Sequence, residues 1–255
     1  MIYSKVSGEG RPIVLLHGYA EDHSLWNRLA KSLKLEYKVI AIDLPGFGKS
    51  SRLPGKFSID DVATSVQKFL QEELMLTEFL VMGHSLGGYV ALSLAANYPE
   101  AVHGFGLINS TALADSPEKK ANRLKTADFI RKYKAPFFLE NFVPNLFYED
   151  NRHALTDEIN TVIEMGKDLD EDLLADYMIA MMNRPERINL LSEYEHVLFI
   201  GGEKDTGFTS EDYNTQISAL NNNENAHVLH NVGHMSMFEA PGELETLTER
   251  FLKSI

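Results

Sequence analysis

The sequence predicts an α/β protein in which a mostly parallel sheet of about eight strands carries helices on both faces. Two observations lead to this prediction. Short apolar runs alternate with longer segments of helical periodicity, as they do in chains that build parallel sheets covered on both sides. The alternation stops between residues 111 and 191, which predicts a helical lid, or cap, inserted into a core domain formed by residues 1–110 and 192–255.

Seven segments have the length and composition of strands. Their apolar runs are short and unbroken, as expected of strands that are buried on both faces. We expect the first of them to pair at one edge of the sheet. In chain order the segments are residues 2–6, 13–16, 38–42, 79–82, 105–108, 196–200 and 226–229.

Helical patterns fill most of the gaps between these strands. The helix that starts at Ser58 has Asp60 and Asp61 in its first turn, where negative charge interacts favourably with the helix dipole. Prolines mark other boundaries, because Pro fits the first turn of a helix but stops a helix that precedes it. The remaining predicted helices are residues 85–97, a helix starting at 116–117, residues 168–182 and residues 241–252.

The strongest functional signal is the segment Gly83-His-Ser-Leu-Gly-Gly88, a G-x-S-x-G motif between a strand and a helix. At such a turn the serine has a strained backbone, and its hydroxyl stands above the sheet edge at the helix N-terminus. Gly83 and Gly87 leave room for strand and helix to approach closely. We therefore predict that Ser85 is a nucleophile. The alternative is a glycine-rich helix start with an incidental serine.

A serine hydroxyl is a weak nucleophile and needs a base to take its proton. His234 follows the last predicted strand and should reach the same sheet edge as Ser85, so we predict that it is the base. His230 is the alternative, although it belongs to the strand end. Asp205 follows the preceding strand and is the predicted carboxylate that orients the base, with Glu203 as its local rival.

Acyl transfer also needs two donors that stabilise a developing oxyanion. We predict that one is the backbone N–H of Leu86, directly after the serine. The other is predicted to come from the turn after the first buried strand, where Tyr19 is our choice and Gly18 the alternative. We expect His17, which precedes this turn, to be a structural donor.

Three further residues are predicted to line the substrate pocket. His84 neighbours the nucleophile and is interpreted as structural or pocket-lining. Phe138 and Phe142 belong to an aromatic-rich part of the lid, and aromatic side chains commonly line substrate pockets. Packing of the lid onto the core is the alternative role for these aromatic residues.

Several other kinds of site are disfavoured. The chain has no cysteine, which excludes disulfides, thiolate zinc sites and cysteine nucleophiles. The segment Gly46-Phe-Gly-Lys-Ser50 resembles a phosphate-binding loop, but Asp43 stands where that loop needs its first glycine. No G-x-G-x-x-G follows the first strand, so a dinucleotide site is not expected. We predict a reaction that needs no metal and no cofactor.

Charge and hydropathy restrict the partners. The chain has 24 Lys and Arg against 37 Asp and Glu, a net charge of −13, which argues against binding to nucleic acid or to anionic membranes. The N-terminus has no apolar signal-peptide region, and no apolar run approaches the roughly 18 residues of a membrane span. We expect a cytoplasmic protein that acts on a small ester-like molecule. The sequence leaves a homodimer open.

Together these motifs resemble the α/β-hydrolase superfamily over nearly the whole chain. The landmarks are His17-Gly18, the segment 43–50, the turn at 83–88, Asp205 and His234. The resemblance implies a Ser85–Asp205–His234 triad that cleaves a carboxylic ester of a small or medium substrate through an acyl-serine intermediate. Small bacterial carboxylesterases commonly have a similar Gly-His-Ser-Leu/Met-Gly-Gly turn.

Other branches of this superfamily remain as alternatives. Epoxide hydrolases and haloalkane dehalogenases have Asp at the position of Ser85 and are disfavoured. Carbon–carbon bond hydrolases often have Asn where this chain has His84, and menaquinone-pathway lyases usually have Arg where it has Tyr89. These two classes and the enol-lactonases would use the same triad. A non-catalytic receptor for a small ligand is less favoured, because it needs no triad.

Overall fold

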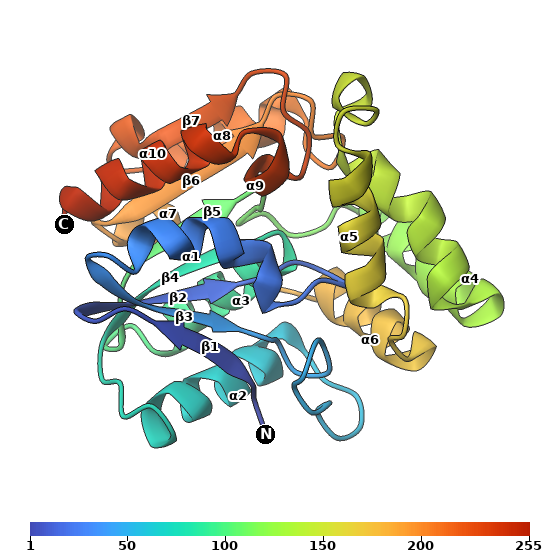
Figure 1. The fold of residues 1–255 in the computed structure, drawn as a ribbon, viewed down its shortest axis with the longest axis horizontal. Helices are drawn as coiled ribbons and strands as arrows, with labels where there is room; N and C mark the ends of the chain where they lie inside the picture. Colours follow the sequence, from blue (N-terminus) through green and yellow to red (C-terminus); the bar gives the residue numbers. More distant parts are fainter.

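A seven-stranded sheet runs through the centre of the protein in the computed structural model, which describes residues 1–255 (Figure 1). The strand order is β1-β3-β2-β4-β5-β6-β7. β1 runs antiparallel to β3, and every other neighbouring pair is parallel. The strands are β1 (Ser4–Ser7), β2 (Arg11–Leu16), β3 (Tyr37–Ile42), β4 (Phe79–His84), β5 (Val102–Ile108), β6 (Val197–Gly202) and β7 (Ala226–Leu229).

The fold class predicted from the sequence is confirmed, and each of the seven predicted segments forms a strand. The expected total of about eight strands is one too high. β1 forms the edge of the sheet beyond β3, and β7 forms the opposite edge, so these seven segments account for the whole sheet. The central strands are covered on both faces, and all six residues of β4 are buried.

Helices cover both faces of the sheet, with α2 and α3 packed together on one face and α1 and α10 on the other (Figure 1). None of the helices has the length and hydropathy needed to cross a lipid bilayer. The α-helices are α1 (Asn27–Leu33), α2 (Ile59–Glu72), α3 (Leu86–Asn97), α4 (Pro117–Phe142), α5 (Thr156–Gly166), α6 (Glu171–Met182), α7 (Leu190–Glu193), α8 (Ser210–Ala219), α9 (Ser236–Glu239) and α10 (Pro241–Lys253). The 3-10 helices are η1 (His23–Trp26), η2 (Val143–Leu146), η3 (Glu149–Asn151) and η4 (Asn223–Asn225).

Local sequence explains where several helices begin. At the start of α2, the Ser58 hydroxyl accepts the N–H of Asp61, and the Asp61 carboxylate accepts the N–H of Ser58. This reciprocal capping box satisfies two N–H groups that the first turn leaves without partners. Ser116 caps α4 and Asp170 caps α6 in a similar way, each accepting one backbone N–H. The predicted starts at Ser58 and Ser116 are therefore confirmed.

Between β5 and β6 the chain forms α4, α5, α6 and α7 and no strand; residues 111–191 are called the insertion below. Figure 1 shows α4, α5 and α6 grouped beyond one end of the sheet. α4 is broken near its middle, where Lys134 has a φ of 74° and Pro136 follows two residues later. Pro cannot continue the hydrogen bonding of a helix, so the two halves of α4 take different directions.

Two buried tyrosines attach the insertion to the core. The Tyr177 hydroxyl on α6 donates to the carbonyl of Pro45, at 2.7 Å. The Tyr19 hydroxyl, from the loop after β2, donates to the carbonyl of Leu174 on α6, at 2.9 Å. Each bond joins a loop of the core to the same helix of the insertion, so α6 is fixed relative to the sheet edge.

Candidate active site

Ser85 lies at the turn between β4 and α3 in a conformation that few residues with a side chain adopt. Its φ is 49° and its ψ is −114°. Backbone strain of this kind costs of the order of 1–3 kcal/mol and persists only where its surroundings enforce it. The Ser85 N–H donates to the Ile108 carbonyl at 3.1 Å, and the Ser85 carbonyl accepts the Ser110 hydroxyl at 2.7 Å. Contacts at the end of β5 therefore hold the strained turn that the sequence predicts.

The same turn requires glycine on both sides of the serine. A Cβ at Gly83 would lie 2.1 Å from the carbonyl carbon of Gly87. A Cβ at Gly87 would lie 2.2 Å from the carbonyl oxygen of Leu16, on the neighbouring strand. Both distances are far below van der Waals contact, so a side chain at either position would force the strand and the helix apart.

Asp205 and His234 form a buried pair at the ends of β6 and β7. The Nδ1 of His234 lies 2.6 Å from Oδ2 of Asp205, which also accepts the side-chain amide of Asn109 at 3.3 Å. The other carboxylate oxygen accepts the Gly207 N–H at 2.9 Å. Burial alone would raise the pKa of Asp205, but His234 and the N–H donors hold that pKa below its usual value. The carboxylate therefore remains ionised at neutral pH.

Opposing effects also act on the imidazole of His234. Its burial disfavours the charged form, while the carboxylates of Asp205, Glu21 and Glu239 favour it. The net result is a pKa above the ordinary value of histidine. The backbone N–H of His234 donates to the carbonyl of Leu146, at 2.7 Å, so the insertion also helps to hold this loop.

One cavity of about 270 Å³ brings the three predicted catalytic residues together. Ser85, Asp205 and His234 all line it, with further walls from the insertion. The structure has no hydrogen bond between the Ser85 hydroxyl and the His234 ring. Hydrogen bonds of this type are often long before a substrate tightens the site. The arrangement has the components of an activated nucleophile: a serine, a buried histidine and an ionised carboxylate that fixes the histidine tautomer.

The structure separates the two alternatives for the second oxyanion donor. The N–H of Gly18 donates to the buried carboxylate of Glu21, at 2.6 Å, and is therefore engaged. The N–H groups of Tyr19 and Leu86 have no acceptor within the protein. This favours the predicted pair, Tyr19 and Leu86. His17 is structural: its Nε2 accepts a backbone N–H, that of Leu44, at 2.9 Å, and its Nδ1 lies 2.7 Å from the Gly18 carbonyl.

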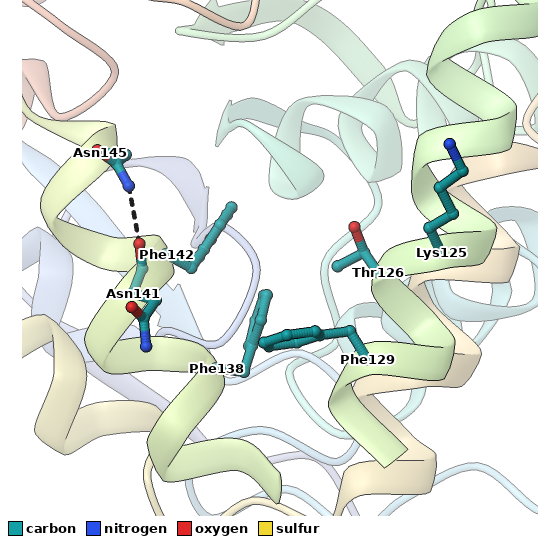
Figure 2. A pocket seen from close by; sticks show the side chains of 7 residues that line it. All are labelled: Lys125, Thr126, Phe129, Phe138, Asn141, Phe142 and Asn145. Carbon is teal, nitrogen blue, oxygen red and sulfur yellow. Dashed lines mark hydrogen bonds between the residues drawn. The ribbon is translucent and has the colours of Figure 1, made fainter. Parts of the chain in front are cut away.

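One of the three predicted pocket residues reaches the cavity that contains Ser85. Phe142 lines that cavity and also a separate, outer cleft of about 360 Å³. Phe138 lines the outer cleft only, where its ring lies near that of Phe129 across the two halves of α4 (Figure 2). His84 ends β4, is fully buried and does not line the cavity, but its ring lies 4.9 Å from that of His234. The Nε2 of His84 lies 3.4 Å from Oε1 of Glu21.

Sequence reasoning missed two groups of site residues. Asn109, which supports Asp205, follows a predicted strand at the expected sheet edge, and this position was a usable signal. The other group is charged and comes mainly from the insertion, where no pattern in the sequence shows which side of a helix faces the cavity. Its members are Asp115, Lys119, Arg123 and Arg184.

One group of side chains has the spacing of a metal site, at Asp22, His23 and Asp43. Hydrogen bonds of the fold already use their ligand atoms. Asp43 accepts the backbone N–H and the Nδ1 of His23, both at 2.7 Å, and the N–H of Lys49 at 2.9 Å. Asp22 accepts the N–H of Ser24 at 2.7 Å. These contacts shape the loops after β2 and β3 and account for the cluster.

Comparison with known sequences assigns residues 11–241 to the family described as alpha/beta hydrolase fold. Lipase 1 of Psychrobacter immobilis is 27% identical over 263 residues, which cover 95% of this chain and 77% of the lipase. The pimeloyl-[acyl-carrier protein] methyl ester esterase of Aeromonas hydrophila is 37% identical over 106 residues, covering 41% of this chain and 39% of that esterase. Other curated relatives are matched over a smaller share of their length, such as 30% of an acetyltransferase component of the acetoin cleaving system of Pseudomonas putida.

Solved structures match over nearly the full length. An esterase from Thermogutta terrifontis has a TM-score of 0.90 and 25% identity, covering 99% of this chain and 93% of that chain. The enol-lactonase from Burkholderia xenovorans LB400 has a TM-score of 0.87 and 20% identity, covering 99% and 96% of the two chains. The family model spans residues 11–241, which is most of the sequence. The chain therefore belongs to the alpha/beta hydrolase fold family.

Proposed function

We propose that this protein is a serine hydrolase that cleaves carboxylic esters of small or medium size. The observation that carries the proposal is the strained Ser85 in one cavity with the buried Asp205–His234 pair. The relatives named as lipases and esterases support ester bonds as the target.

In the proposed mechanism His234 takes the proton of Ser85 as the serine oxygen attacks the ester carbonyl. The N–H groups of Tyr19 and Leu86 stabilise the oxyanion of the tetrahedral intermediate. His234 then protonates the leaving alcohol, which leaves an acyl group on Ser85. A water molecule activated by His234 releases the acid, and Asp205 stays ionised and stabilises the imidazolium in both halves of the reaction.

The proposal is tested with p-nitrophenyl esters from acetyl to octanoyl, assayed with wild type and Ser85→Ala. We expect clear turnover by the wild type and a loss of roughly 10⁴-fold or more in kcat for the variant. Ser51→Ala is the matched control, because Ser51 is exposed and lies outside the cavity. The acyl length with the highest kcat/KM reports the size of the pocket.

The same experiment separates the alternatives. If folded wild type hydrolysed none of these esters, the esterase proposal would be wrong. Assays with lactones, vinylogous diketones and other carbon acids would then distinguish an enol-lactonase, a carbon–carbon bond hydrolase and a lyase. A ligand bound without turnover, with unchanged affinity in Ser85→Ala, would instead indicate a receptor.

A further inference from the structure

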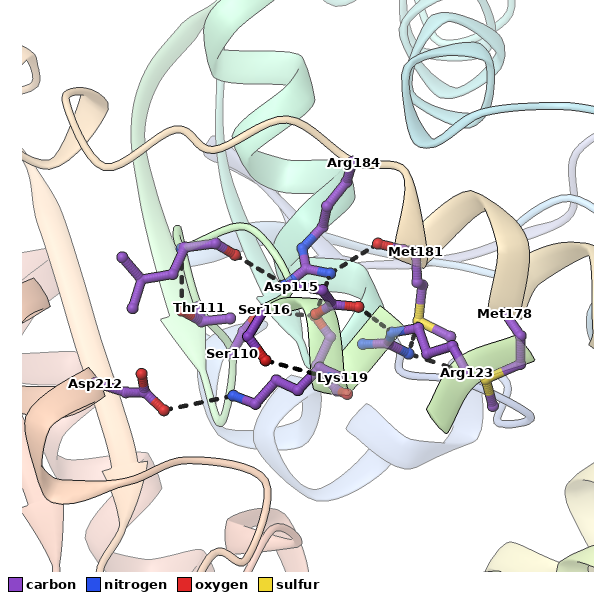
Figure 3. Close-up of polar contacts among 12 residues, drawn as sticks. Ser110, Thr111, Asp115, Ser116, Lys119, Arg123, Met178, Met181, Arg184 and Asp212 are labelled. Carbon is purple, nitrogen blue, oxygen red and sulfur yellow. Dashed lines mark hydrogen bonds and ion pairs between the residues drawn. The ribbon is translucent and has the colours of Figure 1, made fainter. Parts of the chain in front are cut away.

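Part of the wall of the active-site cavity is strongly cationic. Lys119 and Arg123 on α4 and Arg184 after α6 all line the cavity that contains Ser85. Figure 3 shows the polar contacts of these three side chains. The same three side chains line a neighbouring cavity of about 630 Å³. This concentration of positive charge contrasts with the net charge of −13 of the whole chain. Overall composition therefore does not explain it.

One buried carboxylate holds two of these cations in place. The Oδ1 of Asp115 accepts Nη1 of Arg184 at 2.8 Å, and the Oδ2 of Asp115 accepts Nε of Arg123. Arg184 also donates to the carbonyls of Leu113, at 2.8 Å, and Met181, at 2.7 Å. Arg184 is thus a structural residue whose guanidinium is largely satisfied by the protein.

Arg123 and Lys119 have donors that the protein does not satisfy. The Nη1 of Arg123 lies near the sulfurs of Met181 and Met178, at 3.4 and 3.9 Å, and sulfur is a weak acceptor. The Tyr89 hydroxyl is a further polar neighbour of this guanidinium, but apart from Asp115 no carboxylate of the protein bonds to it. Lys119 has one long contact, 3.4 Å to a carboxylate oxygen of Asp212, and its side chain is 42% exposed.

The carboxylates near these donors are already engaged elsewhere. Asp115 pairs with Arg123 and Arg184, and Asp212 makes the one long contact with Lys119. Asp205 lines the same cavity, but its oxygens accept hydrogen bonds from the triad histidine and from two other N–H groups, and it pairs with neither Arg123 nor Lys119. Cations grouped on one wall of a partly enclosed cavity attract anions locally even when the whole protein is acidic.

We propose that the substrate of this site is an ester that carries a carboxylate, bound by Arg123 and Lys119 while its ester carbonyl lies at Ser85. This inference rests on the proposed function. The guanidinium and ammonium donors suit a carboxylate. A neutral acyl chain would leave them without partners, and sites built from such groups reject substrates that lack the matching polar atom. A cavity of about 270 Å³ suits a short monoester of a dicarboxylic acid.

The test compares two esters that differ in charge and hardly in shape: monomethyl adipate and the amide in which –CONH₂ replaces its carboxylate. The kcat/KM of each is measured at low ionic strength, by methanol release. We expect wild type to prefer the carboxylate at least about tenfold, which corresponds to one charge-assisted hydrogen bond. This preference should fall about tenfold in Arg123→Gln and in Lys119→Gln.

Lys120→Gln is the matched control, because Lys120 is the next residue on α4, is exposed and lines neither cavity. It removes the same charge and should keep the wild-type preference. Equal turnover of the two esters by wild type would overturn the inference, as would a preference that survives in Lys119→Gln. The Lys119 variant decides the matter if Arg123→Gln does not fold, because Lys119 lies outside the buried Asp115 network.

A binding measurement keeps this inference separate from the proposed function. If wild type hydrolyses neither the methyl esters nor the p-nitrophenyl esters, the esterase proposal fails while the anion site is still open to test. Calorimetry with adipate and Ser85→Ala then decides it, with the double variant Ser85→Ala, Lys119→Gln as comparison. Binding of adipate that weakens about tenfold in the double variant supports the site. Absence of binding to Ser85→Ala overturns it.

Discussion

Burial and nearby charge have opposite effects on the pKa of His234, the proposed catalytic base. The carboxylates of Asp205, Glu21 and Glu239 outweigh burial and raise the pKa of His234 above its ordinary value. Only the neutral imidazole accepts a proton from Ser85. We therefore expect kcat/KM to fall on the acid side with a midpoint above about 6.5, the usual pKa of histidine. A pH profile from 5 to 9 with p-nitrophenyl butyrate checks this, and a midpoint below 6.5 would contradict it.

Replacing the carboxylate that orients the histidine should remove most of the activity. Asp205→Asn keeps the shape of the side chain but lets His234 bond in the wrong tautomer, and it removes the charge that stabilises the imidazolium. We expect kcat to fall on the order of 10⁴-fold. Glu203→Gln is the control, because Glu203 is exposed and contacts His230 instead of the triad histidine. Near-normal activity of Asp205→Asn would show that another carboxylate has this role.

At the residue scale, the sequence predicted those residues whose position in the chain determines their position in space. Ser85, Asp205 and His234 each follow a strand, and the carboxyl ends of parallel strands meet at one edge of a sheet. The direction of a side chain is harder to predict. Phe138 and Phe142 lie one helical turn apart after the break in α4 and both line the outer cleft, yet only Phe142 also reaches the cavity that contains Ser85. The helical pattern alone does not distinguish the two positions.

At the scale of elements, the glycines of the turn between β4 and α3 let the backbones of β2, β4 and α3 approach one another closely. Gly87→Ala would place a Cβ 2.2 Å from the Leu16 carbonyl, so we expect a loss of about 3 kcal/mol or more in the free energy of unfolding. Gly242→Ala is the contrasting variant. Gly242 lies in α10 with nothing within 4 Å of an added Cβ, and alanine there should stabilise by up to about 1 kcal/mol. Urea unfolding of both variants tests the pair, and equal effects would contradict this account.

Among the helices, the starts could be predicted from local sequence, whereas the break in α4 could not. The capping box at Ser58 and the Ser-Pro start of α4 are local signals, and both gave correct helix starts. The break at Lys134 is a consequence of packing, since a residue with a side chain takes a positive φ only when neighbouring elements enforce it. Pro136 indicates that the helix is interrupted near this position, but it does not predict the angle between the two halves of α4.

At the scale of the whole molecule, two buried tyrosine hydroxyls join the insertion to the core, and we expect their removal to affect stability alike but catalysis differently. Tyr19 and Tyr177 each donate one buried hydrogen bond between the two parts. Replacing either with Phe should cost about 0.5–1.5 kcal/mol in the free energy of unfolding. Tyr19 lies in the proposed oxyanion loop, so Tyr19→Phe should also lower kcat, whereas Tyr177→Phe should leave kcat near wild type. Matched effects on kcat in the two variants would contradict this division.

The architecture of the whole molecule was the part most open to prediction. Alternation of strands and helices predicts a parallel sheet, and a long helical stretch between two strands predicts the insertion. The contacts between the insertion and the core involve residues far apart in the chain, such as Tyr19 and Leu174. The ion pair of Lys119 with Asp212 is another such contact, and no periodicity relates residues so far apart.

Tyr19 therefore belongs to two parts of the molecule at once. Its backbone N–H is the proposed donor beside Ser85, while its hydroxyl is held by α6 of the insertion. A displacement of α6 would therefore also displace the N–H that faces the reacting carbonyl. We expect substrate contacts with the insertion to influence the position of this donor, and with it the stability of the transition state. The insertion would then control the rate of the reaction as well as the shape of the pocket.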